Sequence, residues 1–527
     1  MTMRMSRRSI LGGLAAVAAG GRAIAQPRQG GTLQMVVAPE PSTLVSIDNS
    51  FGATSKISPK VTEGLLTYDL DLRPLPQLAT SWSISPDGLR YTFRLRSGVT
   101  WHDGRQFTAD DVAFSIMTLK RVHPRGRGTF AGVTEVATPD PLTAVIVLSK
   151  PAPYLISALA AGEAPIVPKH IYQDTDISAN PNNGHPIGTG PFVFREWVKG
   201  SHVILDRNPA YWDKPKPYLD RVIIRFIPDA GARSAAFEAK EIDLGGDTPV
   251  PMADLERIKA VPFLGIETRG YRYTGNQSQL VFNLDSKKLA DLRLRQAIAH
   301  AVDLKAVLAT AWYGYGRVSP TAISPALAAF HDDAIKPYTN DLALAARLLD
   351  EAGYPRGEDG KRFSLRLTFN PYNDGNRRSA EYIRQALGRL GIDAPLSAYD
   401  FAAYVKTVYT DRAFDIEVAQ LSNMFDPTIG VQRVYWSKNF KPGLGFSNGA
   451  HYNSPEADRL LEAAAVEPSS SARRELFVRF QKVVYDDLPL LNLVAFDTVT
   501  VFNRRVHDHT LTADGLNANF ADVYLDG

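Results

Sequence analysis

The stretch that decides the fold spans residues 78–115 and reads LATSWSISPDGLRYTFRLRSGVTWHDGRQFTADDVAFS. Apolar and polar residues alternate through residues 81–84 and again through residues 90–96, which is the pattern of two half-buried strands. Residues 85–88 (SPDG) stand between them, with proline at the second turn position and glycine at the fourth. The spacing therefore predicts a β-hairpin, with Trp82 and Ile84 on one apolar face.

A second turn and a helix follow the hairpin. Residues 101–104 (WHDG) form the turn, and Thr108 can cap a helix that carries Asp111 at the capping-box position. Apolar side chains then repeat at helical spacing on one face: Val112, Ile116 and Leu119. The sequence therefore predicts a capped helix that packs on the hairpin.

This order of hairpin, WHDG turn and capped helix resembles the signature region of the family 5 extracellular solute-binding proteins, the peptide, nickel and oligosaccharide receptors of ABC importers. GTGPF at residues 188–192 and RNPAYW at residues 207–212 resemble further segments of that family. The resemblance extends from about residue 31 to the C-terminus. It implies an α/β fold: a two-lobed periplasmic binding protein of type II, in its large three-subdomain form, with the ligand cleft between the lobes.

The resemblance also implies how the chain is divided. The first lobe is expected over residues 26–279, with an inserted subdomain at about residues 55–185 that holds the signature stretch. The second lobe is expected over residues 280–498, and residues 499–527 return to the first lobe. A chain of 527 residues is too long for a single hydrophobic core, which agrees with such a division.

Residues 1–25 are predicted to be a signal peptide. Arg7 and Arg8 precede an apolar run at residues 10–19, which is too short to span a bilayer, and residues 23–25 (AIA) form a cleavage site. The paired arginines favour twin-arginine export, and an ordinary Sec signal is the alternative. We therefore expect a protein of the periplasm. As a separate expectation, it acts as a monomer.

Composition narrows the classes of partner. The chain has no cysteine, which excludes disulfides, thiolate metal sites and a lipid anchor on an N-terminal cysteine. Removal of the four arginines of the signal peptide takes the formal net charge from +3 to −1. A nearly neutral chain argues against nucleic acid or an anionic membrane surface as a partner. No stretch outside the signal peptide is long and apolar enough to span a membrane.

The sequence carries no recognisable catalytic motif, whether GxSxG, HExxH, Walker A or GxGxxG. His507 and His509 would share one face of a strand, but no third ligand stands nearby, so an exposed surface pair is expected rather than a metal site. We therefore predict a binding protein with no catalytic residue, metal or cofactor. An exported hydrolase is the alternative from another class.

The segment best suited to contact a ligand is residues 420–437, QLSNMFDPTIGVQRVYWS. It is rich in aromatic and amide side chains and follows a strand-like stretch, which is the composition that a small-molecule cleft needs. The resemblance places this region, the segment around residue 370 and the PEPSTL loop at residues 39–44 at the cleft. The candidate ligand-binding residues are Glu40, Asn370, Tyr372, Asn423, Phe425, Asp426 and Trp436.

Two of these residues depart from the peptide-binding members of the family. Asn423 stands where those receptors have an aspartate for the ligand's amino group, and Asn370 stands where dipeptide receptors have an arginine for the carboxylate. Leaving the charged ends of a buried ligand unpaired costs several kcal/mol. The amides therefore favour a neutral polar solute such as a sugar, an opine-like compound or a capped peptide, with Asp426 able to supply one negative charge.

The resemblance as a whole implies a receptor that captures a peptide or peptide-like solute by lobe closure. Such a receptor delivers the solute to an ABC permease and ATPase complex in the inner membrane. A receptor for a neutral oligosaccharide or opine-like conjugate remains the alternative, and so does a receptor that signals rather than transports.

Overall fold

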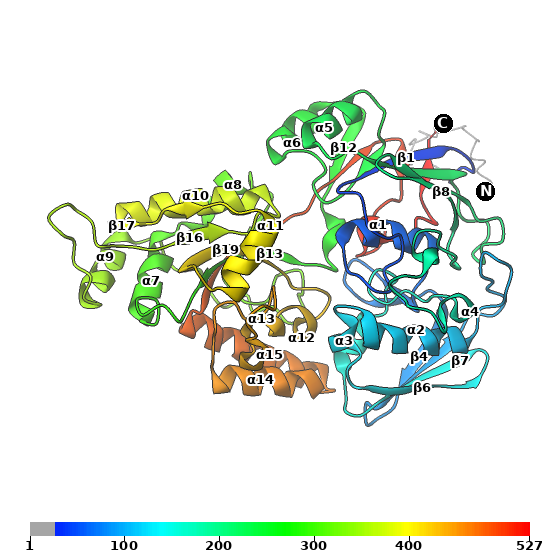
Figure 1. Ribbon diagram of the computed structural model, residues 1–527, viewed down its shortest axis with the longest axis horizontal. Coiled ribbons are helices and arrows are strands. Elements are labelled where there is room, and N and C mark those ends of the chain that lie inside the picture. Colours follow the sequence, from blue (N-terminus) through cyan, green and yellow to red (C-terminus); the bar gives the residue numbers. More distant parts are fainter. Residues whose placement is uncertain (1–26, 527) are drawn as a thin grey trace, which may run out of the picture.

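Two large sheets divide the chain into two lobes, which lie side by side in Figure 1. The computed structural model describes residues 27–526. The predicted signal peptide, residues 1–25, therefore lies outside the described residues.

The first lobe is built on a seven-stranded mixed sheet. In spatial order its strands are β12 (Leu264–Glu267), β21 (Thr500–Asn503), β11 (Leu244–Gly245), β1 (Thr32–Val37), β10 (Arg221–Phe226), β9 (His202–Arg207) and β8 (Phe192–Val198). Neighbouring side chains of β1 point to opposite faces. Met35 packs with α1 (Gly52–Val61), whereas Val36 packs with α5 (Ala230–Glu238) and α6 (Leu255–Ala260), so helices cover both faces.

The inserted subdomain holds a four-stranded antiparallel sheet. Its order is β4 (Ala79–Ile84), β5 (Arg90–Leu95), β7 (Thr143–Leu148) and β6 (Val133–Asp140), and α2 (Ala109–Val122) packs on it. The predicted hairpin and helix are thus confirmed, and the Thr108 backbone N–H donates to Asp111 Oδ2 at 2.9 Å as the capping box requires. Trp82 and Ile84 share one face of β4, as predicted, but Ile84 is 45% exposed where it lines a groove between the lobes.

The WHDG turn is fastened to the GTGPF segment. The His102 backbone N–H donates to the Gly188 carbonyl at 2.9 Å, and the His102 side-chain Nε2 lies 3.0 Å from the Gly190 carbonyl oxygen. The Gly190 N–H in turn donates to the carbonyl of Val61 at the end of α1. Two motifs that are far apart in the sequence therefore join the inserted subdomain to the first lobe.

The second lobe is built on a six-stranded sheet. Its order is β14 (Gly316–Val318), β20 (Leu490–Phe496), β13 (Asn276–Phe282), β19 (Ile416–Ser422), β16 (Leu367–Phe369) and β18 (Leu396–Ser397). Its longer helices are α7 (Leu292–Ala301), α8 (Leu304–Ala311), α9 (Leu342–Glu351), α10 (Asp374–Arg389), α14 (Pro455–Val466) and α15 (Ser470–Asp487).

Short elements complete the fold. Three two-stranded sheets pair β2 (Leu66–Tyr68) with β3 (Pro74–Pro76), β15 (Phe363–Ser364) with β17 (Ile392–Asp393), and β22 (Val506–His507) with β23 (Tyr524–Leu525). The short α-helices are α3 (Gly126–Thr129), α4 (Lys169–Tyr172), α11 (Phe401–Val405), α12 (Pro427–Gly430) and α13 (Gln432–Tyr435). In Figure 1, α12 and α13 lie on the side of the second lobe that faces α3 of the first.

The chain passes from one large sheet to the other at two places. β13 begins at Asn276 within the second sheet, so the second lobe starts before residue 280. β20 ends at Phe496 in the second sheet and β21 begins at Thr500 in the first. A protein joined by two such crossings can open and close about them.

The close approach at Gly188 generates a prediction. A methyl group added there would lie 1.7 Å from the Val61 carbonyl oxygen, so Gly188→Ala forces the GTGPF segment away from α1. We expect the free energy of unfolding to fall by about 3 kcal/mol, measured by thermal or denaturant unfolding. Gly128→Ala is the control, because a methyl group there meets no atom within 4 Å. Equal stability of the two variants would contradict this account.

Candidate ligand-binding site

A row of three packed aromatic rings joins the two lobes. The ring of Phe425 lies 4.9 Å from that of Tyr273, which lies 5.3 Å from that of Tyr68 in the first lobe. The Tyr273 hydroxyl donates to the Ser157 carbonyl at 2.7 Å. Phe425 is buried in the same cluster as the core of the inserted subdomain, so it serves the contact between the lobes.

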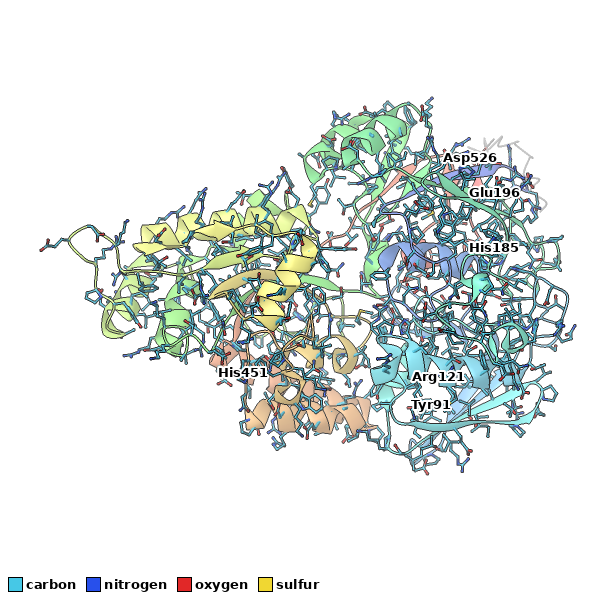
Figure 2. All side chains as sticks on the ribbon, viewed as in Figure 1. Tyr91, Arg121, His185, Glu196, His451 and Asp526 are labelled. Atoms are coloured by element: carbon cyan, nitrogen blue, oxygen red, sulfur yellow. The ribbon has the colours of Figure 1, made fainter. Side chains whose placement is uncertain are left out.

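A groove of about 850 Å³ runs between the inserted subdomain and the second lobe. Arg73, Ile84 and Tyr91 line it from the first lobe, and Phe330 and Arg473 line it from the second. Figure 2 shows Tyr91 within the inserted subdomain. A volume of several hundred Å³ is the size of a small-molecule site.

The lobes also approach each other at the start of α1. Tyr372, in the loop after β16, is 65% exposed, and its hydroxyl lies 3.8 Å from the position that a Cβ atom would take on Gly52. Lys56 of α1 forms an ion pair with Asp247 beside this contact. Tyr372 therefore presents a free aromatic surface where both lobes could reach one solute.

Asn370 lies beside Tyr372, as the sequence spacing requires. Its side-chain Oδ1 accepts the Tyr372 backbone N–H at 2.9 Å, which holds the loop. The buried Asn370 side chain thus positions Tyr372.

Asn423 and Asp426 are both engaged within the second lobe. Asn423 is 0% exposed, and its amide accepts the Ser324 N–H at 2.7 Å and donates to Gln277 at 3.3 Å. Asp426 forms a buried bidentate pair with Arg473, at 2.6 and 2.7 Å. Asp426 therefore does not supply the free negative charge that the sequence suggested, because Arg473 neutralises it.

Glu40 and Trp436 also have partners in their own lobes. Glu40 accepts the indole N–H of Trp197 on β8 and the backbone N–H of Gly200 in the turn after β8, both at 2.9 Å. The Trp436 indole N–H donates to Glu462 at 2.8 Å on α14. The structure thus brings Asn370 and Tyr372 together, but it shows no contact between them and Glu40 or Trp436.

Sequence reasoning missed two charged residues of the second lobe. Glu417 on β19 and Arg433 on α13 line one small pocket of about 20 Å³. Burial raises the pKa of Glu417 to about 7. Burial lowers the pKa of Arg433 to about 10, and the positive charge of Arg125 in the first lobe adds to that effect. Arg433 stands within the segment 420–437, so its positive charge among aromatic and amide side chains could have identified it from the sequence as a candidate site residue.

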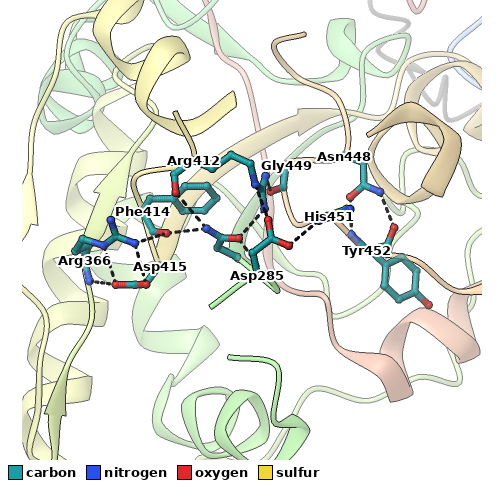
Figure 3. A network of polar contacts seen from close by, with 10 residues as sticks. Asp285, Arg366, Arg412, Phe414, Asp415, Asn448, Gly449, His451 and Tyr452 are labelled. Atoms are coloured by element: carbon teal, nitrogen blue, oxygen red, sulfur yellow. Dashed lines mark hydrogen bonds and ion pairs between the residues drawn. The ribbon is translucent and has the colours of Figure 1, made fainter. Parts of the chain in front are cut away.

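The network in Figure 3 supports one wall of this pocket. Arg412 donates to the Gly449 carbonyl at 2.8 Å and to Asp285 at 2.7 Å, and His451 lies 2.6 Å from the same aspartate. Gly449 lines the pocket, so these contacts hold its backbone against β19.

The predicted pair of surface histidines is wrong for His509, which is buried and bonds to Thr510 at 2.8 Å, while His507 pairs with Asp526 at 2.6 Å. Within residues 27–526, no group of three or more His, Asp or Glu side chains is arranged to hold a metal ion. Over the same residues, no helix is both long and apolar enough to cross a membrane.

The family described as bacterial extracellular solute-binding proteins, family 5 Middle, matches residues 73–443. The chain is a family 5 extracellular solute-binding protein. Members of this family bind solutes and are not enzymes, so the alternative of an exported hydrolase is set aside.

Three relatives illustrate the range of the family. The dipeptide-binding protein of Escherichia coli (strain K12) is 28% identical over 489 residues, which are 85% of this chain and 89% of that protein. NikZ of Campylobacter jejuni, in complex with Ni(L-His), is 26% identical with a TM-score of 0.79, over 93% of this chain and 97% of NikZ. AgaA of A. tumefaciens R10, in complex with agropinic acid, is 25% identical with a TM-score of 0.76, over 94% and 99%. This family 5 protein therefore has the mixed α/β fold of periplasmic binding proteins.

The pairing of Asp426 generates a prediction for this solute-binding protein. Asp426→Asn leaves the Arg473 guanidinium buried without a carboxylate, so we expect the free energy of unfolding to fall by about 3–5 kcal/mol. Glu456→Gln is the control, because it removes only exposed pairs with Arg459 and Arg479 and should change stability little. If the Asp426→Asn variant is as stable as the wild type but has lost affinity for the solute, Asp426 contacts the solute after all.

Proposed function

We propose that this protein is the periplasmic receptor of an ABC importer and that it captures a peptide or peptide-like solute between its lobes. The observation that carries the proposal is the approach of Tyr372 to Gly52 across the lobes. The groove that both lobes line is a second place where one solute can touch both. The dipeptide-binding relative supports the choice of solute class. The permease and ATPase of the inner membrane are the proposed partners.

The proposed mechanism is a shift of population between open and closed forms. The two crossings between the large sheets let the lobes rotate, and a solute that touches both lobes binds the closed form more tightly. The closed form is the signal that the permease recognises. Export by the predicted signal peptide and action as a monomer without a lipid anchor belong to the same proposal.

The alternative of a neutral solute has less support than the two amides suggested. The Asn423 amide bonds to Ser324 and Gln277, so its replacement of an aspartate does not expose a neutral group to a solute. The argument for a neutral solute then depends on Asn370 alone. We therefore place peptide-like solutes first and keep sugars and opine-like conjugates as rivals in the experiment.

A thermal-shift screen of the purified protein tests the function. The panel holds di- to pentapeptides, capped peptides, opine-type conjugates, neutral oligosaccharides, haem and Ni²⁺ with and without histidine. A solute at 100 times its Kd should stabilise the folded state by about 2.7 kcal/mol, which raises the melting temperature visibly. Stabilisation by free peptides supports the proposal, and stabilisation by sugars alone would transfer it to the neutral-solute alternative. Absence of any shift across the panel would refute the receptor function.

Tyr372 provides the matching substitution. Because its ring is exposed, we expect Tyr372→Ala to leave the melting temperature of the unbound protein unchanged and to weaken binding of the solute found above by more than about 1 kcal/mol. Leu142→Ala, which removes an exposed side chain beside β7, is the control. Calorimetric titration of both variants measures the difference, and equal affinities would remove Tyr372 from the site.

A further inference from the structure

Arg433 is a cation without an acidic partner. Its guanidinium donates only to backbone carbonyls, those of Gly430 at 3.0 Å, Ser422 at 3.4 Å and Phe446 at 3.5 Å. No ion pair joins it to any Asp or Glu side chain within residues 27–526. An arginine offers a planar fork of donors that matches a carboxylate, and two of the three carbonyl contacts of Arg433 are long, at 3.4 and 3.5 Å.

The first lobe does not neutralise Arg433 either. Arg125, whose positive charge acts on Arg433 from the first lobe, is itself paired with Glu163, with its Nε 2.7 Å from Glu163 Oε2. The Glu163 carboxylate is therefore already paired with Arg125 and does not balance the positive charge of Arg433. Arg433 belongs to α13, which lies with α12 on the side of the second lobe that faces α3 of the first (Figure 1).

Glu417 in the same pocket has an unpartnered oxygen. The residue is 1% exposed; its Oε2 accepts the Tyr404 hydroxyl at 2.7 Å, while its Oε1 has no hydrogen-bond partner. Buried polar atoms without partners are rare in folded proteins because each costs free energy. Among the buried side-chain atoms without a partner within residues 27–526, Glu417 Oε1 is the only carboxylate oxygen, and a donor from outside the protein would satisfy it.

Glu63 shows what a structural buried carboxylate looks like in this protein. It accepts hydrogen bonds from four side chains: Thr189, Tyr211, Trp212 and Asn519. Burial raises the pKa of Glu63 to about 7, as it does for Glu417. Both glutamates are buried, but only Glu63 has hydrogen-bond donors for both of its carboxylate oxygens. Burial alone therefore does not explain why Glu417 Oε1 has no donor.

We propose that Arg433 and Glu417 form an anchoring subsite for a carboxylate-bearing organic solute. The solute's carboxylate pairs with Arg433, and a neighbouring N–H or O–H of the solute donates to Glu417 Oε1. The pocket's volume of about 20 Å³ is the room that about one water molecule needs, so only the tip of a polar group enters it and the rest of the solute stays outside. The subsite depends on the receptor function proposed above and specifies the solute class: an acid whose charged end enters the second lobe.

Matched pairs of probes test the carboxylate. Di- and tetrapeptides are titrated as free acids and as C-terminal carboxamides, and acetate and succinate are compared with acetamide and succinamide at equal ionic strength. We expect the free acids to bind roughly 30-fold or more tightly than the amides. Arg433→Gln should abolish this difference.

Arg474→Gln is the matched control, because Arg474 also donates only to carbonyls, those of Ala328 and Ala329, but lies exposed on α15. It should keep the preference for acids. Arg433→Gln should leave the melting temperature of the unbound protein unchanged or raise it, because it removes an unpaired cation, whereas a structural role would lower it. Glu417→Gln should weaken binding of the peptides but not of acetate, which has no neighbouring donor.

The outcomes separate the two proposals. Solutes that bind equally as acid and amide, or equally to wild type and Arg433→Gln, would overturn the subsite and leave the receptor function standing. If neutral solutes bind and no carboxylate probe does, the subsite is again overturned. If no solute in either panel binds, the receptor function itself fails.

Discussion

The burial of Phe425 against Tyr273 is the contact on which the arrangement of the site depends. β19 ends at Ser422, and the chain runs directly into this ring, which is held in the core of the inserted subdomain. Burial of an aromatic side chain contributes a few kcal/mol, and here it joins two lobes that are linked covalently only at two crossings. The short helix α12 that follows is therefore placed against the first lobe, where Ile429 packs on the core of the inserted subdomain.

Charge is distributed unevenly over the structure. Asp426 and Arg473 neutralise each other inside the second lobe, and Glu63 is surrounded by neutral donors in the first. In both cases hydrogen bonds offset the free-energy cost of removing the charged group from water, as buried charges require. Arg433 and Glu417 depart from this rule in one small pocket of the second lobe, where the proposed solute completes the hydrogen bonds.

A good part of the fold could be predicted from local pattern. The hairpin, the SPDG turn and the capped helix of residues 78–115 follow from alternation, turn residues and capping, because each depends on neighbours only a few residues away. The candidate site could be predicted only in part. Asn370 and Tyr372 are neighbours in sequence and remain neighbours in space, whereas Asn423 was assigned to a solute although its partners, Ser324 and Gln277, stand far away in the sequence.

The sequence by itself determined the family, the two-lobed α/β fold and the signature hairpin, since these depend on motifs that are contiguous in the chain. Only the tertiary structure decided which polar side chains are already satisfied. Asp426 and Arg433 look equally available in the segment 420–437, but one meets Arg473 and the other meets only carbonyl oxygens. A polar side chain is available to a solute only if no residue distant in the sequence has already paired with it. Tertiary packing decides which distant residues meet, and local sequence does not.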